Sequence, residues 1–140
     1  MVRQVRAVRS HAGSAQNPAD RVLQRVRAQC LALPETSERS SWGHPNFCAG
    51  KRTFVAFERV QGRPSIAFRL EPDDVARLSG RSDFFVTPYG RGQWVSLWAD
   101  VPLDWKAVGA LLQRSYRLVA LKRMIAALEH KSPSTGDRHR

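Results

Sequence analysis

Cysteines and long apolar segments are both scarce in this 140-residue sequence. There are two cysteines, Cys30 and Cys48, which are too few for the disulfide framework of a small secreted domain. No apolar run approaches the roughly 20 residues that a bilayer-spanning helix needs. The first residues also lack the apolar segment of a secretory signal. We therefore expect a cytoplasmic protein with no membrane partner, in which Cys30 is a buried, unreactive thiol.

Acidic residues are few in comparison with basic ones. The chain has 12 Asp and Glu against 23 Lys and Arg, of which 19 are Arg, and its formal net charge is +11. Residues 21–128 alone hold 17 basic and 9 acidic residues, so most of the surplus lies in the part expected to fold. The surplus indicates a polyanionic partner, or else it reflects a high-G+C coding bias that favours Arg over Lys. Composition leaves both explanations open.

The chain length is sufficient for one compact core and too short for two ordinary domains. We predict a single domain over residues 18–130, because the periodic apolar pattern begins after Pro18. Residues 1–17 contain arginines but no acid, and residues 131–140 are polar, so both segments are expected to be flexible tails. An arginine-bearing start without acids also fits a mitochondrial transit peptide, and that alternative stays open.

The apolar pattern predicts helices and strands in the order α-β-β-β-α-β-β-α. Helices are expected from Pro18 to before Pro34, from the start signal Glu71-Pro72-Asp73-Asp74 to Gly80, and after Asp104. A Ser-rich polar connector follows the first helix. Alternating apolar residues between turn signals predict the strands Trp42–Phe47, Thr53–Arg59, Ser65–Leu70, Phe84–Val86 and Gln93–Trp98. The fold class is therefore α+β, a two-layer α/β sandwich with a five-stranded antiparallel sheet and helices on one face.

The last predicted helix has two polar residues within its apolar stripe. At 100° per residue, Ser115 and Lys122 fall among the apolar side chains of that helix. A break near Ser115-Tyr116 would reorient the following turns and free Lys122. Alternatively, the Ser115 hydroxyl donates a hydrogen bond back to its own helix.

Five groups of residues occur in an order and spacing similar to those of one known family. They are Trp42-Gly43-His44-Pro45-Asn46-Phe47, Gly50-Lys51, Phe84-Phe85-Val86-Thr87-Pro88-Tyr89, Gly92-Gln93-Trp94-Val95 and Ser115-Tyr116-Arg117-Leu118-Val119. Over residues 20–128 the sequence resembles the MmcQ/YjbR family. The resemblance implies a bacterial protein with a double-winged sheet, akin to frataxin and secretion chaperones, and a DNA-binding role. It supplies no catalytic residues, and it departs from the family pattern at Arg52-Thr53, where more apolar residues are expected.

Basic residues at predicted turns and on the last helix are candidates for nucleic-acid binding. Cations on projecting elements can neutralise phosphates and release counterions. The candidates are Lys51, Arg52, Arg63, Arg91, Lys106, Arg114 and Arg117. Trp94 and Trp98 share one sheet face and offer stacking surfaces to unpaired bases if they are open to solvent. The alternative is that both indoles pack in the core and the arginines form an ordinary solvated surface.

A ligand pocket is the second candidate site. Its expected lining residues are His44, Trp94, Ser115, Tyr116 and Lys122. His44 and Cys48 are spaced like metal ligands, but a closed zinc site needs four ligands, so no metal and no cofactor are expected. Ser115 lacks a nucleophile elbow, and no glycine-rich phosphate loop precedes a helix, so no enzymatic activity is expected.

These patterns favour a non-catalytic DNA-binding protein that contacts mainly the phosphate backbone. The alternative function is a protein-interaction or small-ligand-binding module of secretion-chaperone-like fold. The distribution of surface residues distinguishes the two. A continuous positive face favours DNA, whereas scattered charge beside an apolar groove favours a peptide or a small ligand.

Overall fold

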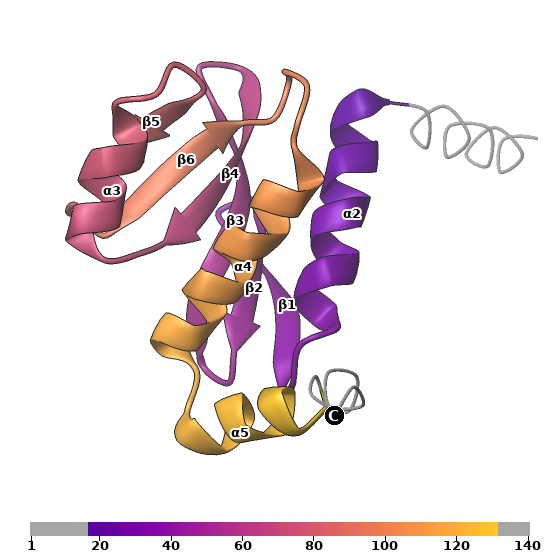
Figure 1. The fold of residues 1–140 in the computed structure, drawn as a ribbon. Coiled ribbons are helices and arrows are strands. Elements are labelled where there is room, and N and C mark those ends of the chain that lie inside the picture. The colour runs from indigo at the N-terminus through magenta and orange to yellow at the C-terminus, as the bar shows by residue number, and fades with distance from the viewer. Residues whose placement is uncertain (1–16, 132–140) are drawn as a thin grey trace, which may run out of the picture.

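The computed structural model describes residues 17–131, which form a sheet layer and a helix layer (Figure 1). The strands are β1 (Thr36–Ser41), β2 (His44–Ala49), β3 (Arg52–Val60), β4 (Arg63–Arg69), β5 (Phe84–Val86) and β6 (Trp94–Trp98). The helices are α2 (Pro18–Leu31), α3 (Pro72–Ser79), α4 (Trp105–Val119) and α5 (Lys122–Lys131). The predicted α+β class with an antiparallel sheet is confirmed. The expected tails lie outside the described residues, apart from Asn17, which caps α2, and Lys131.

The sheet has six strands in the order β1-β2-β3-β4-β6-β5, so the prediction of five strands was wrong. The additional strand is β1, which lies in the segment expected to be a polar connector. β1 is an edge strand that pairs only with β2, and most of its side chains are exposed. Because none of its side chains is buried, its sequence shows no apolar alternation. Polar and charged side chains are typical of edge strands, where they discourage pairing with other chains.

Three tight turns of the sheet share one backbone conformation. They are Trp42-Gly43 between β1 and β2, Gln61-Gly62 between β3 and β4, and Arg91-Gly92 in the β5–β6 loop. Both residues of each turn have positive φ, with values of 54° and 82° for Trp42 and Gly43. Two positive φ angles define the type I′ turn, which favours Asn, Asp or Gly at its first position. Trp42, Gln61 and Arg91 therefore adopt a conformation that is costly for their residue types.

The last predicted helix is two helices, and the break lies later than expected. α4 continues through Ser115 and Tyr116 and ends at Val119, since Ala120 is extended with ψ of 152°. α5 then begins at Lys122, whose side chain is exposed. The chain turns here rather than at Ser115, and Ser115 and Tyr116 both lie on the buried face of the uninterrupted α4.

The Ser115 hydroxyl does not donate back to its helix. Ser115 is fully buried, and its Oγ has no hydrogen-bond partner among residues 17–131. A buried polar group without a partner is destabilising, and Ala is the best helix former. We expect Ser115→Ala to raise the free energy of unfolding by about 1 kcal/mol in urea denaturation. Ser79→Ala, which removes a bonded hydroxyl of α3, is the control, and a loss of stability in Ser115→Ala would show that its hydroxyl has a partner.

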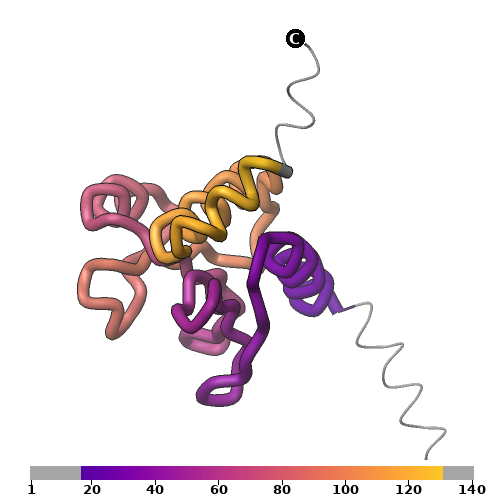
Figure 2. Tube along the Cα trace, turned by 90° about the horizontal axis from the view of Figure 1, so that it is seen from below, coloured from indigo at the N-terminus to yellow at the C-terminus, as the bar shows by residue number. Residues whose placement is uncertain are grey.

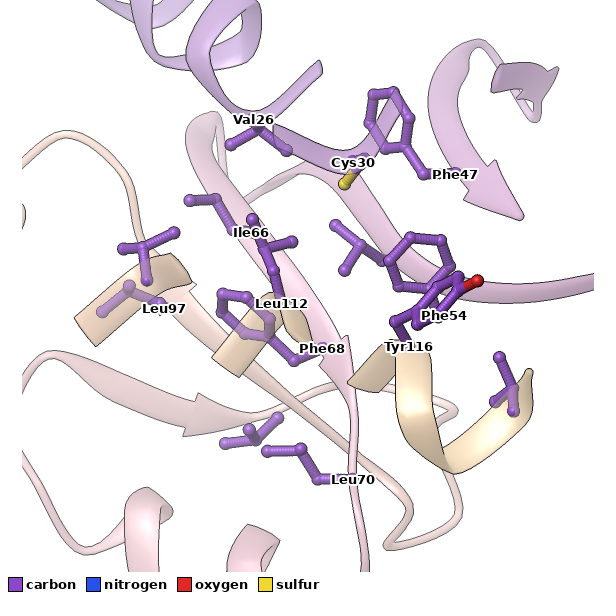
Figure 3. Packing of buried hydrophobic residues seen from close by; sticks show 14 of the residues in the cluster. Val26, Cys30, Phe47, Phe54, Ile66, Phe68, Leu70, Leu97, Leu112 and Tyr116 are labelled. Atoms are coloured by element: carbon purple, nitrogen blue, oxygen red, sulfur yellow. The ribbon is translucent and has the colours of Figure 1, made fainter. Parts of the chain in front are cut away.

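The core lies between the helices and one face of the sheet. α2 packs against β1 and β2, α4 against β3 and β4, and α3 against β5 and β6. Figure 2 shows α2 and the α4–α5 pair on one side of the strands. Cys30 is among the buried residues of this core, as expected, and burial raises the pKa of its thiol. Large buried side chains of the core, shown in Figure 3, include Phe47, Phe54, Ile66, Phe68, Leu70, Leu112 and Tyr116.

The opposite face of the sheet has no helix of residues 17–131 packed on it, and we call it the open face. Side chains alternate between the two faces along each strand. Val55, Phe68 and Val95 are cross-strand neighbours in the core, so the residues that alternate with them belong to the open face. No helix within residues 17–131 is long and apolar enough to cross a membrane.

Candidate binding site on the open face

A row of small side chains crosses the open face and forms the floor of a pocket. Asn46, Ala56, Ala67 and Ser96 are successive cross-strand neighbours on β2, β3, β4 and β6, and the first three of them line the pocket. Small residues in the middle of a sheet leave space above the backbone that larger side chains would fill. The resulting pocket has a volume of about 660 Å³. Its lining residues are Trp42, His44, Asn46, Thr53, Ala56, Glu58, Ala67, Thr87, Pro88, Tyr89, Gly90 and Trp94.

Two exposed aromatic side chains lie at the pocket, one from each of two turns. Trp42 comes from the β1–β2 turn and is 92% exposed, and Tyr89 comes from the β5–β6 loop and is 100% exposed. Both residues have positive φ, 54° for Trp42 and 63° for Tyr89. Bulky residues in this region are strained, and such strain concentrates at functional sites. The fold therefore holds two large aromatic rings in water at a cost in stability, which makes them candidates for contact with a ligand.

Backbone contacts fix the loop that carries Tyr89. The Gly90 N–H donates to Thr87 O at 3.1 Å, and the Gln93 N–H donates to Gly90 O at 3.0 Å. The Thr87 N–H donates to Trp94 O at 3.3 Å, which closes the loop onto β6. Only glycine fits at position 90, since a Cβ there would lie 2.8 Å from Trp94 Cβ. Tyr89 is thus presented by a folded loop, which lowers the entropy lost when a ligand binds.

Polar groups of the pocket offer both hydrogen-bond donors and acceptors. His44 Nε2 lies 3.5 Å from Glu58 Oε2, and the Asn46 Nδ2 donates to His44 O at 3.4 Å. Asn46 and Glu58 keep further capacity for hydrogen bonds to a ligand. Within residues 17–131, no group of three or more His, Cys, Asp or Glu could hold a metal ion. The arrangement is suited to binding a planar ligand with polar edges.

The expected convergence of five pocket residues does not occur. His44 and Trp94 line the pocket, but Ser115 and Tyr116 lie on α4, which packs against the other face of the sheet. The Tyr116 hydroxyl donates to Pro34 O at 2.8 Å, and its ring packs edge-on against Phe54. Lys122 is exposed at the start of α5. Sequence reasoning did not assign Trp42, Asn46, Glu58 or Tyr89 to the pocket, although three of them stand within the family landmarks.

The seven candidate nucleic-acid contacts do not form one continuous surface. Lys106, Arg114 and Arg117 lie on α4 in the helix layer. The other four lie in the sheet layer, where Lys51 and Arg52 are at the β2–β3 turn, Arg63 begins β4, and Arg91 is in the β5–β6 loop. Arg52 is exposed and Thr53 is half-buried, so the departure from the family pattern coincides with a partly solvated strand start.

Three of the seven cations are paired with carboxylates. Arg63 donates two hydrogen bonds to Asp100, at 2.7 and 2.8 Å. The Arg117 Nη1 donates to Glu129 at 2.8 Å. The Arg114 Nε donates to Asp74 at 2.9 Å. Hydrogen bonds from Arg77 and Arg114 hold the pKa of the Asp74 carboxyl below its usual range. These pairs reduce the positive potential that the arginines present to a polyanion.

The two tryptophans of β6 are both half-buried but differ in what packs on their rings. The Trp98 ring is stacked on Phe85 at 4.2 Å between centroids, and the Arg63 guanidinium lies 3.8 Å from the Trp98 ring centroid. Phe85 and Arg63 therefore occupy the stacking positions around Trp98. Trp94 instead lines the pocket and is half-buried. Of the two predicted stacking surfaces, Trp94 is the one at the pocket.

Comparison with known proteins identifies a family model and solved structures of similar fold. The YjbR family model matches residues 31–118. The crystal structure of Deinococcus radiodurans protein DR2400, with a DUF419 domain, has a TM-score of 0.61 and 19% identity, and covers 78% of this chain and 86% of its own. A Pseudomonas syringae protein has a TM-score of 0.53 and 14% identity, and covers 59% of this chain and 86% of its own. No curated protein matches the sequence. These identities show likeness of fold alone.

Proposed function

This chain belongs to the YjbR family, and we propose that it binds single-stranded nucleic acid by taking an unpaired base into the pocket on the open face. One observation carries the proposal. Trp42 and Tyr89 are almost wholly exposed at a pocket whose floor consists of small side chains. An unpaired base is a planar ring with polar edges, which matches the stacking surfaces and hydrogen-bonding groups there.

Base stacking explains why aromatic rings would be kept exposed. A base stacked on an aromatic side chain contributes about 1–3 kcal/mol to binding, largely independent of sequence. Open antiparallel sheets backed by helices bind RNA in this way in the RNA recognition motif, where sheet aromatics stack on unpaired bases. Bases within a duplex are already stacked and cannot enter such a pocket without being flipped out. The proposed ligand is therefore a single strand.

Positive charge near the pocket supports a polyanionic ligand. Arg39 of β1 is exposed and pairs in register with Asn46 of the floor. Arg91 is exposed in the same loop as Tyr89. Neither has a carboxylate partner among the residues that the structure describes. Together with the net charge of +11, these cations attract phosphates to the pocket.

The pocket volume favours a second candidate function, binding of a free planar small molecule. Ligand pockets commonly measure about 300–1,000 Å³, and the volume of about 660 Å³ lies within that range. The same aromatic and polar groups would serve such a ligand. In that case the positive charge of the chain would have no direct role.

Fluorescence titration at several salt concentrations tests the proposal. A short single strand of mixed sequence should quench tryptophan fluorescence and bind at least about 10-fold more tightly than its duplex, since only unpaired bases stack. Two to three phosphate contacts predict a log-log salt slope of about −1.4 to −2. The control is Arg114→Ala with Arg117→Ala in the helix layer, which should bind like the wild type.

Two results would contradict the proposal. Equal or tighter binding of the duplex, with weaker binding in the helix-layer control, would place the nucleic acid on α4. Absence of binding to any nucleic acid, with quenching by a free planar compound, would favour the second candidate function.

A further inference from the structure

Arg69 has a buried nitrogen without a hydrogen-bond partner. Within residues 17–131, Arg69 Nε and Ser115 Oγ are the buried side-chain polar atoms that lack one. An unsatisfied donor on a charged group is more costly than one on a hydroxyl, so native proteins rarely leave it without a role. No carboxylate partner of Arg69 is present in the described part of the chain. Because the Nε is covered while the residue as a whole is half-buried, an acceptor from outside the protein would meet the terminal nitrogens of the guanidinium.

Arg69 lies on the open face beside the pocket, although it is not among the residues that line it. It follows Ala67 of the floor by two residues on β4, so its side chain leaves the sheet on the open face. Its neighbours Phe68 and Leu70 point into the core instead. Across the sheet, Arg69 is in register with Trp94, which lines the pocket.

A carboxylate of the pocket lining and a guanidinium beside the pocket lie toward opposite ends of the floor. Glu58 follows Ala56 on β3 and pairs in register with Ser65. Arg69 lies on the other side of the floor, since Ala67 separates it from Ser65 on β4. A ligand bound across the floor would therefore meet a carboxylate at one end and a guanidinium at the other. Such an arrangement selects a molecule with hydrogen-bond donors at one end and an anion at the other.

We propose that Arg69 binds the phosphate of the nucleotide whose base occupies the pocket. This inference rests on the proposed function and makes it more specific, because the site then recognises a nucleotide unit rather than a base alone. A planar guanidinium can donate two parallel hydrogen bonds to a phosphate, and charge-assisted bonds of this kind are about twice as strong as neutral ones. The phosphate belongs either to a free nucleotide or to a strand, and the test distinguishes these sources.

The test compares adenosine with adenosine 5′-monophosphate by tryptophan fluorescence. We expect the wild type to bind the monophosphate about 10-fold or more tightly than adenosine, since the phosphate accepts charge-assisted hydrogen bonds. Arg69→Gln should remove that preference and leave the affinity for adenosine unchanged. The matched control is Arg63→Gln, on the same strand and paired with Asp100, which should keep the preference. Tighter binding of an oligonucleotide than of the monophosphate would identify a strand as the source of the phosphate.

The remaining outcomes distinguish failure of the role proposed for Arg69 from failure of base binding in the pocket. Equal affinity of the wild type for adenosine and its monophosphate would overturn the role of Arg69 and leave base binding intact. The same conclusion follows if Arg69→Gln lowers the affinity for adenosine and for its monophosphate equally. Failure of adenosine, the monophosphate and the oligonucleotide to bind would refute both proposals. The thermal midpoint of Arg69→Gln is a second measurement, because loss of an unpartnered charge should not lower it, whereas loss of a structural arginine would.

Discussion

Replacing Trp42 and Tyr89 together by alanine is expected to weaken single-strand binding by at least about 30-fold, since each of the two base–aromatic contacts contributes about 1–3 kcal/mol. Both side chains are exposed, so the variant should retain the fold and its thermal midpoint. Fluorescence of the remaining tryptophans would hinder comparison of quenching amplitudes, so affinity is better measured by anisotropy of a labelled strand. Unchanged affinity would exclude the pocket as the binding site.

A single substitution separates the backbone strain at Trp42 from the contribution of its side chain to binding. Asn is favoured at the first position of a type I′ turn, so Trp42→Asn should stabilise the protein by on the order of 0.5–1 kcal/mol while weakening binding. Gln61 occupies the same position of the β3–β4 turn, away from the pocket. Gln61→Asn is therefore the matched control, and it should give a similar gain in stability without loss of binding. A Trp42→Asn variant that is less stable than the wild type would show that the indole packs on the fold.

Tyr116→Ala is expected to destabilise the protein by about 3–5 kcal/mol, the cost of truncating a large buried aromatic side chain. Tyr116 is fully buried and contacts Phe54 edge-on, with 5.6 Å between ring centroids. Burial raises the pKa of the Tyr116 phenol, so the hydroxyl stays protonated and donates to Pro34 O at neutral pH. Urea denaturation measures the effect, and a loss below about 1 kcal/mol would contradict a core role.

The milder variant Tyr116→Phe keeps the ring and removes one hydrogen bond. Its expected cost is about 1 kcal/mol, and its affinity for a single strand should equal that of the wild type. The pair of variants therefore tests whether the landmark Ser115-Tyr116 serves packing or binding. A Tyr116→Phe protein with full stability and weakened binding would show that the Tyr116 hydroxyl takes part in binding.

Local signals in the sequence identified most of the elements that pack in the core. The apolar stripe of α2, the acids at the start of α3 and the alternation in β3, β4 and β6 each predicted the observed element. The family landmarks predicted that the chain belongs to the YjbR family, and the match over residues 31–118 confirms this. β1 was missed because an exposed edge strand carries no apolar pattern. The break after α4 was misplaced because nothing local at Ala120 ends a helix.

The composition of the site depends on contacts that a linear pattern does not show. Ser115 and Tyr116 are landmarks like Trp42 and Tyr89, but the order of landmarks does not tell which face of the sheet each one reaches. The ion pairs of the basic residues could not be predicted either, because their partners are distant in sequence, as Arg114 and Asp74 are. The pocket itself results from small residues on neighbouring strands, and only the strand register brings them into one row.

The repeated turn conformation has a consequence for how this scaffold can diversify. An indole, a carboxamide and a guanidinium occupy the same backbone position at three corners of the sheet, in Trp42, Gln61 and Arg91. The glycine that follows each of them sets the chain reversal, and the preceding side chain projects without being needed for the core. An amino-acid substitution at one of these turn positions therefore changes the side chain presented to a partner, while the strands keep their register. Relatives with the same frame can thus differ in what they bind through substitutions at very few positions.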